Sequence, residues 1–132
     1  MDFEQQVFQQ RVRGMKVIIA GSRSIEDKEV VLQAIADSKF TITEVISGGA
    51  KGVDRMGEEW AEEQGIPFRV IRTGWKRGGR GGGFVNNEDM ADQAEALIAV
   101  YDGESKGTKH MIDTMRKRGK KIFTKMWRPQ AE

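Results

Sequence analysis

Short apolar segments that alternate with amphipathic ones constrain the fold of this chain more than any other feature of its sequence. Met15 to Ala20 is a β-branched apolar run that ends at Gly21, which is typical of a strand buried on both faces of a sheet. The following segment places Val31, Ala34 and Ile35 at helical spacing. A buried strand followed by an amphipathic helix is the repeating unit of a parallel sheet covered by helices.

The same unit recurs along the chain. Further strands are predicted at residues 44–47, 68–71, 96–101 and 121–124, with helices at 53–61 and 108–115. The glycine-rich stretch from Thr73 to Asn87 has neither pattern, so a long irregular loop is predicted there, followed by a short helix to Ala94. We therefore predict an α/β fold, a Rossmann-like three-layer sandwich with a mainly parallel five-stranded sheet flanked by helices.

A chain of 132 residues is long enough for one hydrophobic core and too short for two ordinary domains. Residues 15–126 are predicted to form the α/β domain, residues 1–14 an N-terminal extension or short helix, and residues 127–132 a C-terminal tail. No apolar run approaches the ~20 residues of a membrane span, and the N-terminus lacks the apolar block of a signal peptide. The cytoplasm is therefore the expected location.

The composition excludes several kinds of active site. The chain has no cysteine, which excludes disulfides, thiolate nucleophiles and cysteine-ligated metals. Its single histidine, His110, leaves no His-rich metal site and no pair of histidines for acid–base catalysis within one subunit. We predict no metal site and no cofactor.

The charge is unevenly distributed. The first 66 residues carry 8 basic and 12 acidic side chains, and the remainder carries 14 and 8. The second part is thus suited to attract an anion, either a small phosphate ligand or nucleic acid, although a solvated basic surface is the alternative. The densest basic run, Arg116 to Lys121, ends a predicted helix, where the helix dipole also favours cations.

The loops that follow the predicted strands are the candidate ligand site, because ligands bind beyond the carboxyl ends of an open parallel sheet. Three of them are rich in glycine, which lets the backbone approach a ligand and precedes helix N-termini that favour phosphate. The chain has neither a G-x-x-x-x-G-K-[ST] motif nor a G-x-G-x-x-G motif after its first strand, so an ordinary P-loop is excluded.

The loops do, however, resemble those of a known family. The motifs are Gly21-Ser22-Arg23, SGGAKGVD from Ser47 to Asp54, Trp75, Asn87 and DGESKGT from Asp102 to Thr108. In this order they resemble the SLOG superfamily, most of all its small stand-alone YspA-like proteins, over Met15 to Phe123. DNA-processing protein A and the lonely-guy phosphoribohydrolases share its Rossmann-like core. The resemblance implies binding of a nucleotide or nucleotide-derived ligand across the glycine-rich loops.

Two departures from the family pattern concern chemistry. Lonely-guy hydrolases carry a glutamate that is implicated in cleavage at the position where this chain has Met111. Related proteins often have Arg-Asn where this chain has Asn86-Asn87, so a cationic ligand contact is either lost here or supplied by Arg77 or Arg80. The catalytic residues, if any, stay unknown, and a binding protein is favoured over an enzyme.

The residues expected to contact the ligand are Gly21, Ser22, Arg23, Ser47, Gly48, Gly49, Asp54, Trp75, Asn87, Gly107 and Thr108. Arg23 would clamp a phosphate, unless it is an ordinary surface arginine. Asp54 would accept hydrogen bonds from ribose hydroxyls or stabilise a helix N-terminus. Trp75 would stack on a base or else pack the loop onto the sheet.

Three functions follow from these features. The first is a sensor or sequestering protein for a nucleotide or ADP-ribose-like molecule. The second is a nucleotide hydrolase with an acid or base among Asp54, Glu88, Asp102 and Glu104. The third is single-stranded nucleic-acid binding. Assembly into a homo-oligomer is also expected, through an exposed apolar helix face that bears Met111 and Met115; no membrane partner is expected.

Overall fold

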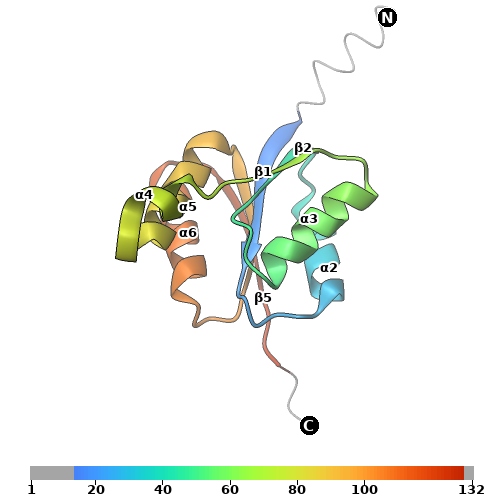
Figure 1. The fold of residues 1–132 in the computed structure, drawn as a ribbon. Helices are drawn as coiled ribbons and strands as arrows, with labels where there is room; N and C mark the ends of the chain where they lie inside the picture. Colours follow the sequence, from blue (N-terminus) through green and yellow to red (C-terminus); the bar gives the residue numbers. More distant parts are fainter. Residues whose placement is uncertain (1–13, 130–132) are drawn as a thin grey trace, which may run out of the picture.

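The structure is a computed structural model that describes residues 14–129, and it contains one five-stranded sheet (Figure 1). All strand pairs are parallel, and the spatial order is β3-β2-β1-β4-β5. The strands are β1 (Met15–Gly21), β2 (Ile42–Ser47), β3 (Phe68–Val70), β4 (Ala96–Tyr101) and β5 (Lys121–Met126). The predicted α/β class, the five strands and the Rossmann-like layering are confirmed.

Helices cover both faces of the sheet (Figure 1). One face carries α2 (Lys28–Ser38) and α3 (Val53–Glu63), and the other carries α5 (Gly82–Gln93) and α6 (Lys106–Lys117). A short helix, α4 (Thr73–Gly78), and a 3₁₀ turn, η1 (Gly79–Gly81), precede α5. None of these helices, within residues 14–129, is long and apolar enough to cross a membrane.

The central strand β1 contributes side chains to two separate cores. Val17 and Ile19 pack in the core beneath α2 and α3, whereas Ile18 and Ala20 pack in the core beneath α5 and α6. Because both faces are covered, the strand is continuously apolar from Val17 to Ala20 instead of alternating with polar residues. The apolar run therefore reflects burial on both faces of the sheet, as predicted from the sequence.

The predicted irregular loop at residues 73–87 is wrong, because this stretch is helical in α4, η1 and α5. Glycine inside a helix costs about 1 kcal/mol relative to alanine, which is why the sequence pattern argued against helices here. The close packing of α4 on α5 requires glycine, because the contact leaves no room for a side chain. A Cβ atom at Gly74 would lie only 2.1 Å from the backbone nitrogen of Asn86, so the two helices could not approach this closely with any other residue there.

The buried side chain of Asn86 holds the start of α4 against α5. Its Oδ1 accepts a hydrogen bond from the Gly74 backbone nitrogen at 3.1 Å, and its Nδ2 donates to the Ile71 carbonyl at 2.7 Å. The single buried amide therefore satisfies a donor and an acceptor of the backbone that leads from β3 into α4.

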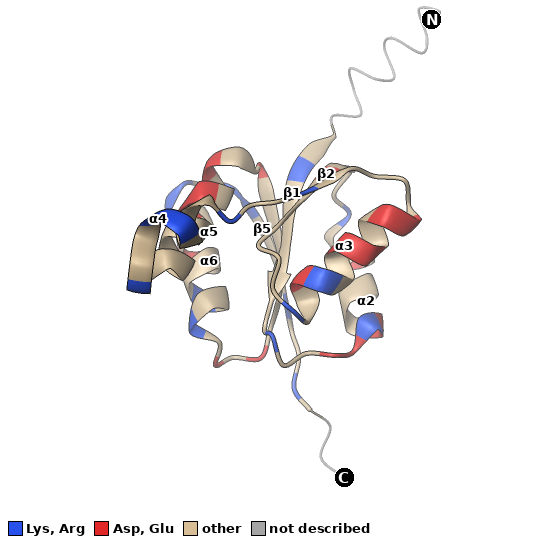
Figure 2. Ribbon diagram, in the orientation of Figure 1, with Lys and Arg blue, Asp and Glu red and all other residues tan. Residues whose placement is uncertain are grey.

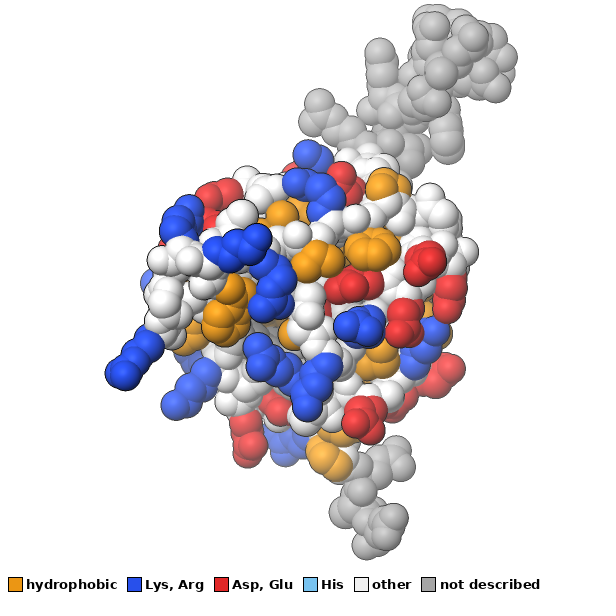
Figure 3. Space-filling view, viewed as in Figure 1, with side chains coloured by type: hydrophobic (Ala, Val, Ile, Leu, Met, Phe, Trp, Pro, Cys, Tyr) orange, Lys and Arg blue, Asp and Glu red, His pale blue; other side chains and the backbone are white. Residues whose placement is uncertain are grey.

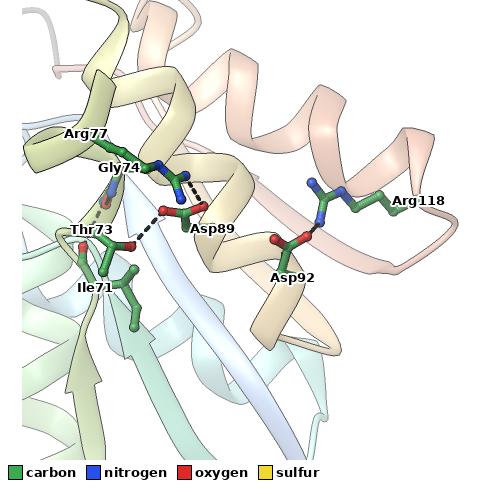
Figure 4. Close-up of polar contacts among 8 residues, drawn as sticks. Ile71, Thr73, Gly74, Arg77, Asp89, Asp92 and Arg118 are labelled. Carbon is green, nitrogen blue, oxygen red and sulfur yellow. Dashed lines mark hydrogen bonds and ion pairs between the residues drawn. The ribbon is translucent and has the colours of Figure 1, made fainter. Parts of the chain in front are cut away.

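Hydrogen bonds and ion pairs join α5 to α4 and to the residue that follows α6, as Figure 4 shows. Asp89 on α5 accepts hydrogen bonds from Thr73 and Arg77 at 2.6 and 2.7 Å, which joins it to α4. Asp92 pairs with Arg118 at the end of α6. The glycine-rich segment is thus an integral layer of the domain.

Two further expectations meet the structure differently. Met111 and Met115 are 1% and 0% exposed in the core between α6 and the sheet, so the expected apolar face for oligomer formation is wrong. The helix turns these side chains inward. Assembly into a homo-oligomer stays a prediction, but this helix face no longer supports it. The predicted N-terminal extension, apart from Gly14, and residues 130–132 of the predicted tail lie outside the described residues.

The contact between α4 and α5 makes a prediction about stability. Gly74→Ala should lower the free energy of unfolding by about 1–3 kcal/mol or more, because the added methyl group meets backbone atoms that cannot move aside cheaply. Gly81→Ala in η1 is the matched control, since no atom lies within 4 Å of its Cβ position, and it should change stability by less than about 0.5 kcal/mol. Urea denaturation followed by circular dichroism measures both. Equal midpoints for the Gly74→Ala variant and the wild type would contradict the close contact.

Candidate functional site

A cavity of about 630 Å³ opens at the sheet edge where the carboxyl ends of β1, β2 and β4 meet. β1 lies between β2 and β4, which is where the strand order reverses, and ligands of open parallel sheets bind at this point. The cavity is therefore where the sheet topology predicts a ligand site. Lys and Arg side chains gather across the middle of the face seen in Figure 3, around patches of apolar side chains.

The structure brings most of the sequence-predicted site residues to this cavity. Those that line it are Gly21, Ser22, Arg23, Gly48, Asp54, Trp75, Asn87, Gly107 and Thr108. Ser47 and Gly49 are not among the lining residues. The Ser47 hydroxyl donates to Glu58 Oε2 at 2.6 Å and accepts from the Gly49 backbone nitrogen at 3.0 Å, so these two residues shape the turn between β2 and α3.

The ends of β1 and β4 are joined at the cavity floor. The Ser22 hydroxyl is 1% exposed and accepts a hydrogen bond from the Asp102 backbone nitrogen at 3.2 Å. The Asp102 carboxylate accepts from the backbone nitrogens of Glu104 and Ser105 at 2.8 and 2.9 Å. These bonds hold the pKa of Asp102 below its usual value, so this carboxylate is ionised.

Two helix N-termini adjoin the cavity. α6 begins after Ser105, whose hydroxyl accepts from the Thr108 backbone nitrogen at 3.3 Å. α3 begins after Gly52 and has no side-chain cap. Gly52 has φ +79°, and a Cβ there would lie 2.7 Å from the Arg23 carbonyl oxygen, so glycine lets the turn before α3 pack on the loop after β1. The uncapped first turn of α3 leaves backbone donors for an anion.

Asp54 lies in the first turn of α3 and lines the cavity while being only 7% exposed. Its Oδ2 accepts a hydrogen bond from the Ala50 backbone nitrogen at 3.3 Å. Burial raises the pKa of Asp54 to about 7, and the nearby Glu58 adds to this, although hydrogen bonds from the backbone of Ala50, Gly21 and Gly48 oppose the rise. The carboxyl group can therefore hold or release a proton near neutral pH.

Three arginines line the cavity from three different segments: Arg23 after β1, Arg72 after β3 and Arg80 in η1. Within residues 14–129 none of them forms an ion pair. Arg72 donates to the Gly48 carbonyl at 3.3 Å. Arg77, the other candidate for the missing family cation, instead pairs with Asp89 outside the cavity. The cavity thus presents free positive charge.

Sequence reasoning missed several residues of the lining, among them Arg72, Phe84 and Met90. Phe84 lies on α5 inside the stretch that was predicted to be an irregular loop, so no helical face could be assigned to it. Arg72 follows the last residues of a predicted strand, and its position after a strand was the available signal. Two of the four carboxylates suggested for acid–base chemistry, Asp54 and Asp102, line the cavity, whereas Glu88 and Glu104 do not.

Aromatic side chains form one wall of the cavity. Trp75 is 39% exposed, and its indole ring lies against the backbone of Gly82 and Gly83, where added Cβ atoms would come within 3.0 Å of the ring. The fit shows that Trp75 packs α4 on α5 and still presents part of its ring to the cavity. The two predicted roles, stacking and packing, are therefore compatible.

Asn87 and Met111 complete the lining from α5 and α6. The Asn87 side chain donates to the Gly107 carbonyl at 3.0 Å and lies 3.1 Å from His110 Nδ1. Met111 faces the cavity at the position where resemblance to the lonely-guy hydrolases would place a glutamate. Among the described residues, no group of three or more histidine, aspartate or glutamate side chains is arranged to hold a metal ion.

The basic run from Arg116 to Lys121 lies at the opposite edge of the sheet, at the end of α6 and the start of β5. Arg118 pairs with Asp92, and Lys120 donates to the carbonyls of Ala91 and Ala94. These bonds connect α5 to the turn after α6, so two of the cations stabilise the domain. Figure 2 shows basic residues on α4 and acidic residues along α3.

Comparisons with known proteins identify a family, a relative and a similar fold. Residues 15–78 match the YAcAr family, described as the YspA, cpYpsA-related SLOG family. The Gene 61 protein of Mycobacterium phage D29 is 31% identical over 114 residues, which cover 79% of this chain and 90% of that protein. DNA processing protein A (DprA) from Streptococcus pneumoniae has a similar fold, with a TM-score of 0.65 and 15% identity over 86% of this chain. This chain covers only 50% of the DprA chain.

The buried carboxyl group predicts how stability depends on pH. The pKa of Asp54 is about 7 in the folded protein and about 3.9 in an unfolded chain, so the folded state binds more protons between these values. The free energy of unfolding should therefore fall as pH rises from about 4 to about 7, by up to about 1.4 kcal/mol per pH unit from this group.

Asp54→Asn should remove this contribution, and Asp92→Asn, at an exposed ion pair, is the matched control. Urea denaturation across this pH range measures the difference between each variant and the wild type. If the difference between wild type and Asp54→Asn stays constant with pH, Asp54 does not titrate as described.

Proposed function

Because this chain belongs to the YspA, cpYpsA-related SLOG family, in which membership implies nucleotide-related binding, we propose that it binds a nucleotide or ADP-ribose-like molecule in the cavity at the carboxyl edge of its sheet. In this proposal the protein acts as a sensor or a sequestering protein. The phosphates lie near the N-termini of α3 and α6, and Arg23 supplies positive charge to them.

One observation carries the proposal: three arginines without ionic partners in the described chain converge on a cavity that also adjoins two helix N-termini. Elsewhere in the domain, arginines such as Arg69 and Arg77 pair with carboxylates. Positive charge that is left free inside a cavity favours a phosphate-bearing ligand, because arginine and helix amides both donate hydrogen bonds to phosphate oxygens.

The size and the mixed lining of the cavity also support the proposal. About 630 Å³ lies within the usual range of small-molecule sites. The arginines and backbone amides lie together with apolar and aromatic side chains such as Trp75, Phe84 and Met90. A molecule with a charged phosphate part and a flat apolar part matches both kinds of surface.

Ligand-induced stabilisation tests the proposal. Thermal unfolding with ADP, ADP-ribose, cyclic nucleotides and NAD should identify a ligand that stabilises the protein by about 2.7 kcal/mol at about 100 times its Kd. Arg23→Ala should weaken the affinity for this ligand on the order of tenfold or more, since it removes a charge-assisted contact.

Arg116→Ala is the matched control, because it removes the same charge from an exposed ion pair at the other edge of the sheet and should leave affinity unchanged. Failure of the whole panel to stabilise the wild type would overturn the proposal. Equal loss of affinity in both variants would mean that net charge, and not the cavity, attracts the ligand.

A second function, hydrolysis of a nucleotide at an N-glycosidic or phosphoester bond, is supported by Asp54. A carboxyl group that lines a cavity and has a pKa of about 7 is suited to act as a general acid or base. Asp54→Asn should then lower kcat about 100-fold or more while the nucleotide still binds. Chromatographic assay of the same panel decides it: if nucleotides bind to the wild type and none is converted, the hydrolase hypothesis is rejected.

A further inference from the structure

Phe84 is an unusual surface residue. It lies in the first turn of α5, lines the cavity and is 49% exposed. Large hydrophobic side chains that stay exposed in the described chain also include Phe68 and Val70 on the edge strand β3 and Met126 at the end of β5. Phe84 and Trp75 differ from these three because they lie in the one cavity that the arginines also line. Apolar surface left open inside a ligand cavity marks a place that a ligand covers.

One face of the Phe84 ring is already covered by His110 from α6. The two rings are nearly parallel, with an angle of 14° between their planes and 4.1 Å between their centroids. The 49% of Phe84 that is exposed therefore belongs to the parts of the side chain that His110 does not cover. A stack of two flat rings can be extended by a third ring on the Phe84 side.

The imidazole ring that backs Phe84 is held in place on both sides. Its Nδ1 lies 3.1 Å from Asn87 Nδ2, and its Nε2 lies 3.5 Å from Thr114 Oγ1. Because Asn87 Nδ2 can only donate, Nδ1 accepts and the proton of the neutral ring resides on Nε2. Burial lowers the pKa of His110 below its usual value, which favours this neutral form. A neutral ring in a fixed orientation is a stable support for a stacking partner.

We infer that the open face of Phe84, supported by His110, is the subsite for the nucleobase of the ligand, so that base, Phe84 and His110 form a continuous stack. The inference rests on the proposed function and extends it by assigning the base to α5 and α6 instead of to Trp75 alone. The chemical class is a flat aromatic heterocycle attached to phosphate. The arginines hold the phosphate end, and the stack holds the base end.

Calorimetric titration with two probes tests the assignment, ADP with a base and inorganic diphosphate without one. Phe84→Leu should weaken the affinity for ADP by about 5- to 100-fold, because base–aromatic stacking is lost. The affinity for diphosphate should stay unchanged. Phe68→Leu, which changes another exposed phenylalanine outside the cavity lining, should affect the binding of neither probe. Trp75→Leu shows whether the indole ring contributes separately.

The single histidine of the chain supplies an independent readout by NMR, because only one set of imidazole ring signals exists outside any purification tag. ADP should shift the His110 ring signals in the wild type, diphosphate should not, and Phe84→Leu should abolish the ADP shift. The spectra are recorded at saturating ADP, so the shift reports the surroundings of the His110 ring and not the affinity, and the signals of the ligand-free variant show that it is folded.

The outcomes distinguish the two proposals. If ADP and diphosphate both bind and Phe84→Leu weakens them equally or not at all, the stacking subsite is wrong while the phosphate site stands. If diphosphate binds to the wild type and ADP does not, the base subsite is also wrong. If neither probe binds and no nucleotide of the panel stabilises the wild type, the proposed function itself fails. An ADP complex that leaves the His110 signals unmoved places the base on Trp75 or elsewhere.

Discussion

Parallel pairing of β1 with both β2 and β4 is the constraint on which the rest of this structure depends. A strand with parallel neighbours on each side brings three carboxyl ends to one edge, and the connecting helices must then pass over opposite faces. The loops after β1, β2 and β4 meet for this reason, although they are distant in sequence. The hydrogen bond between Ser22 and the Asp102 backbone closes the floor across this junction.

The cavity built at this junction is costly to the domain in two ways. Asp54 is buried without a cation bound to it in the described chain, and its hydrogen bonds come only from backbone amides and offset part of its desolvation. The arginines on the rim are likewise left without carboxylate partners. Groups that are poorly neutralised inside a folded domain commonly belong to a binding or catalytic site, where a ligand completes the interactions.

The wall of the cavity depends on α4 and α5 approaching one another closely. Gly74 permits the contact with Asn86, and the Gly82–Gly83 backbone supports the Trp75 ring. The same packing presents Phe84 to the cavity and lets His110 cover its other face. One close helix contact thus connects the stability of the domain with the aromatic surface that a ligand would meet.

Local pattern was enough to predict the strands, most of the helices that follow them and the sheet edge at which the cavity lies, because burial on both faces leaves a continuous apolar run in β1 and β4. The turn from Gly48 to Asp54 and the loop from Asp102 to Thr108 were recognised because each directly follows a predicted strand. Pattern failed where distant contacts decide the outcome. The glycines between Thr73 and Asn87 disfavour a helix locally, and only the packing of α4 on α5 makes it stable. The inward orientation of Met111 and the pairing of Phe84 with His110 likewise depend on how helices rotate against the sheet and against each other, which side-chain spacing in a single segment does not determine.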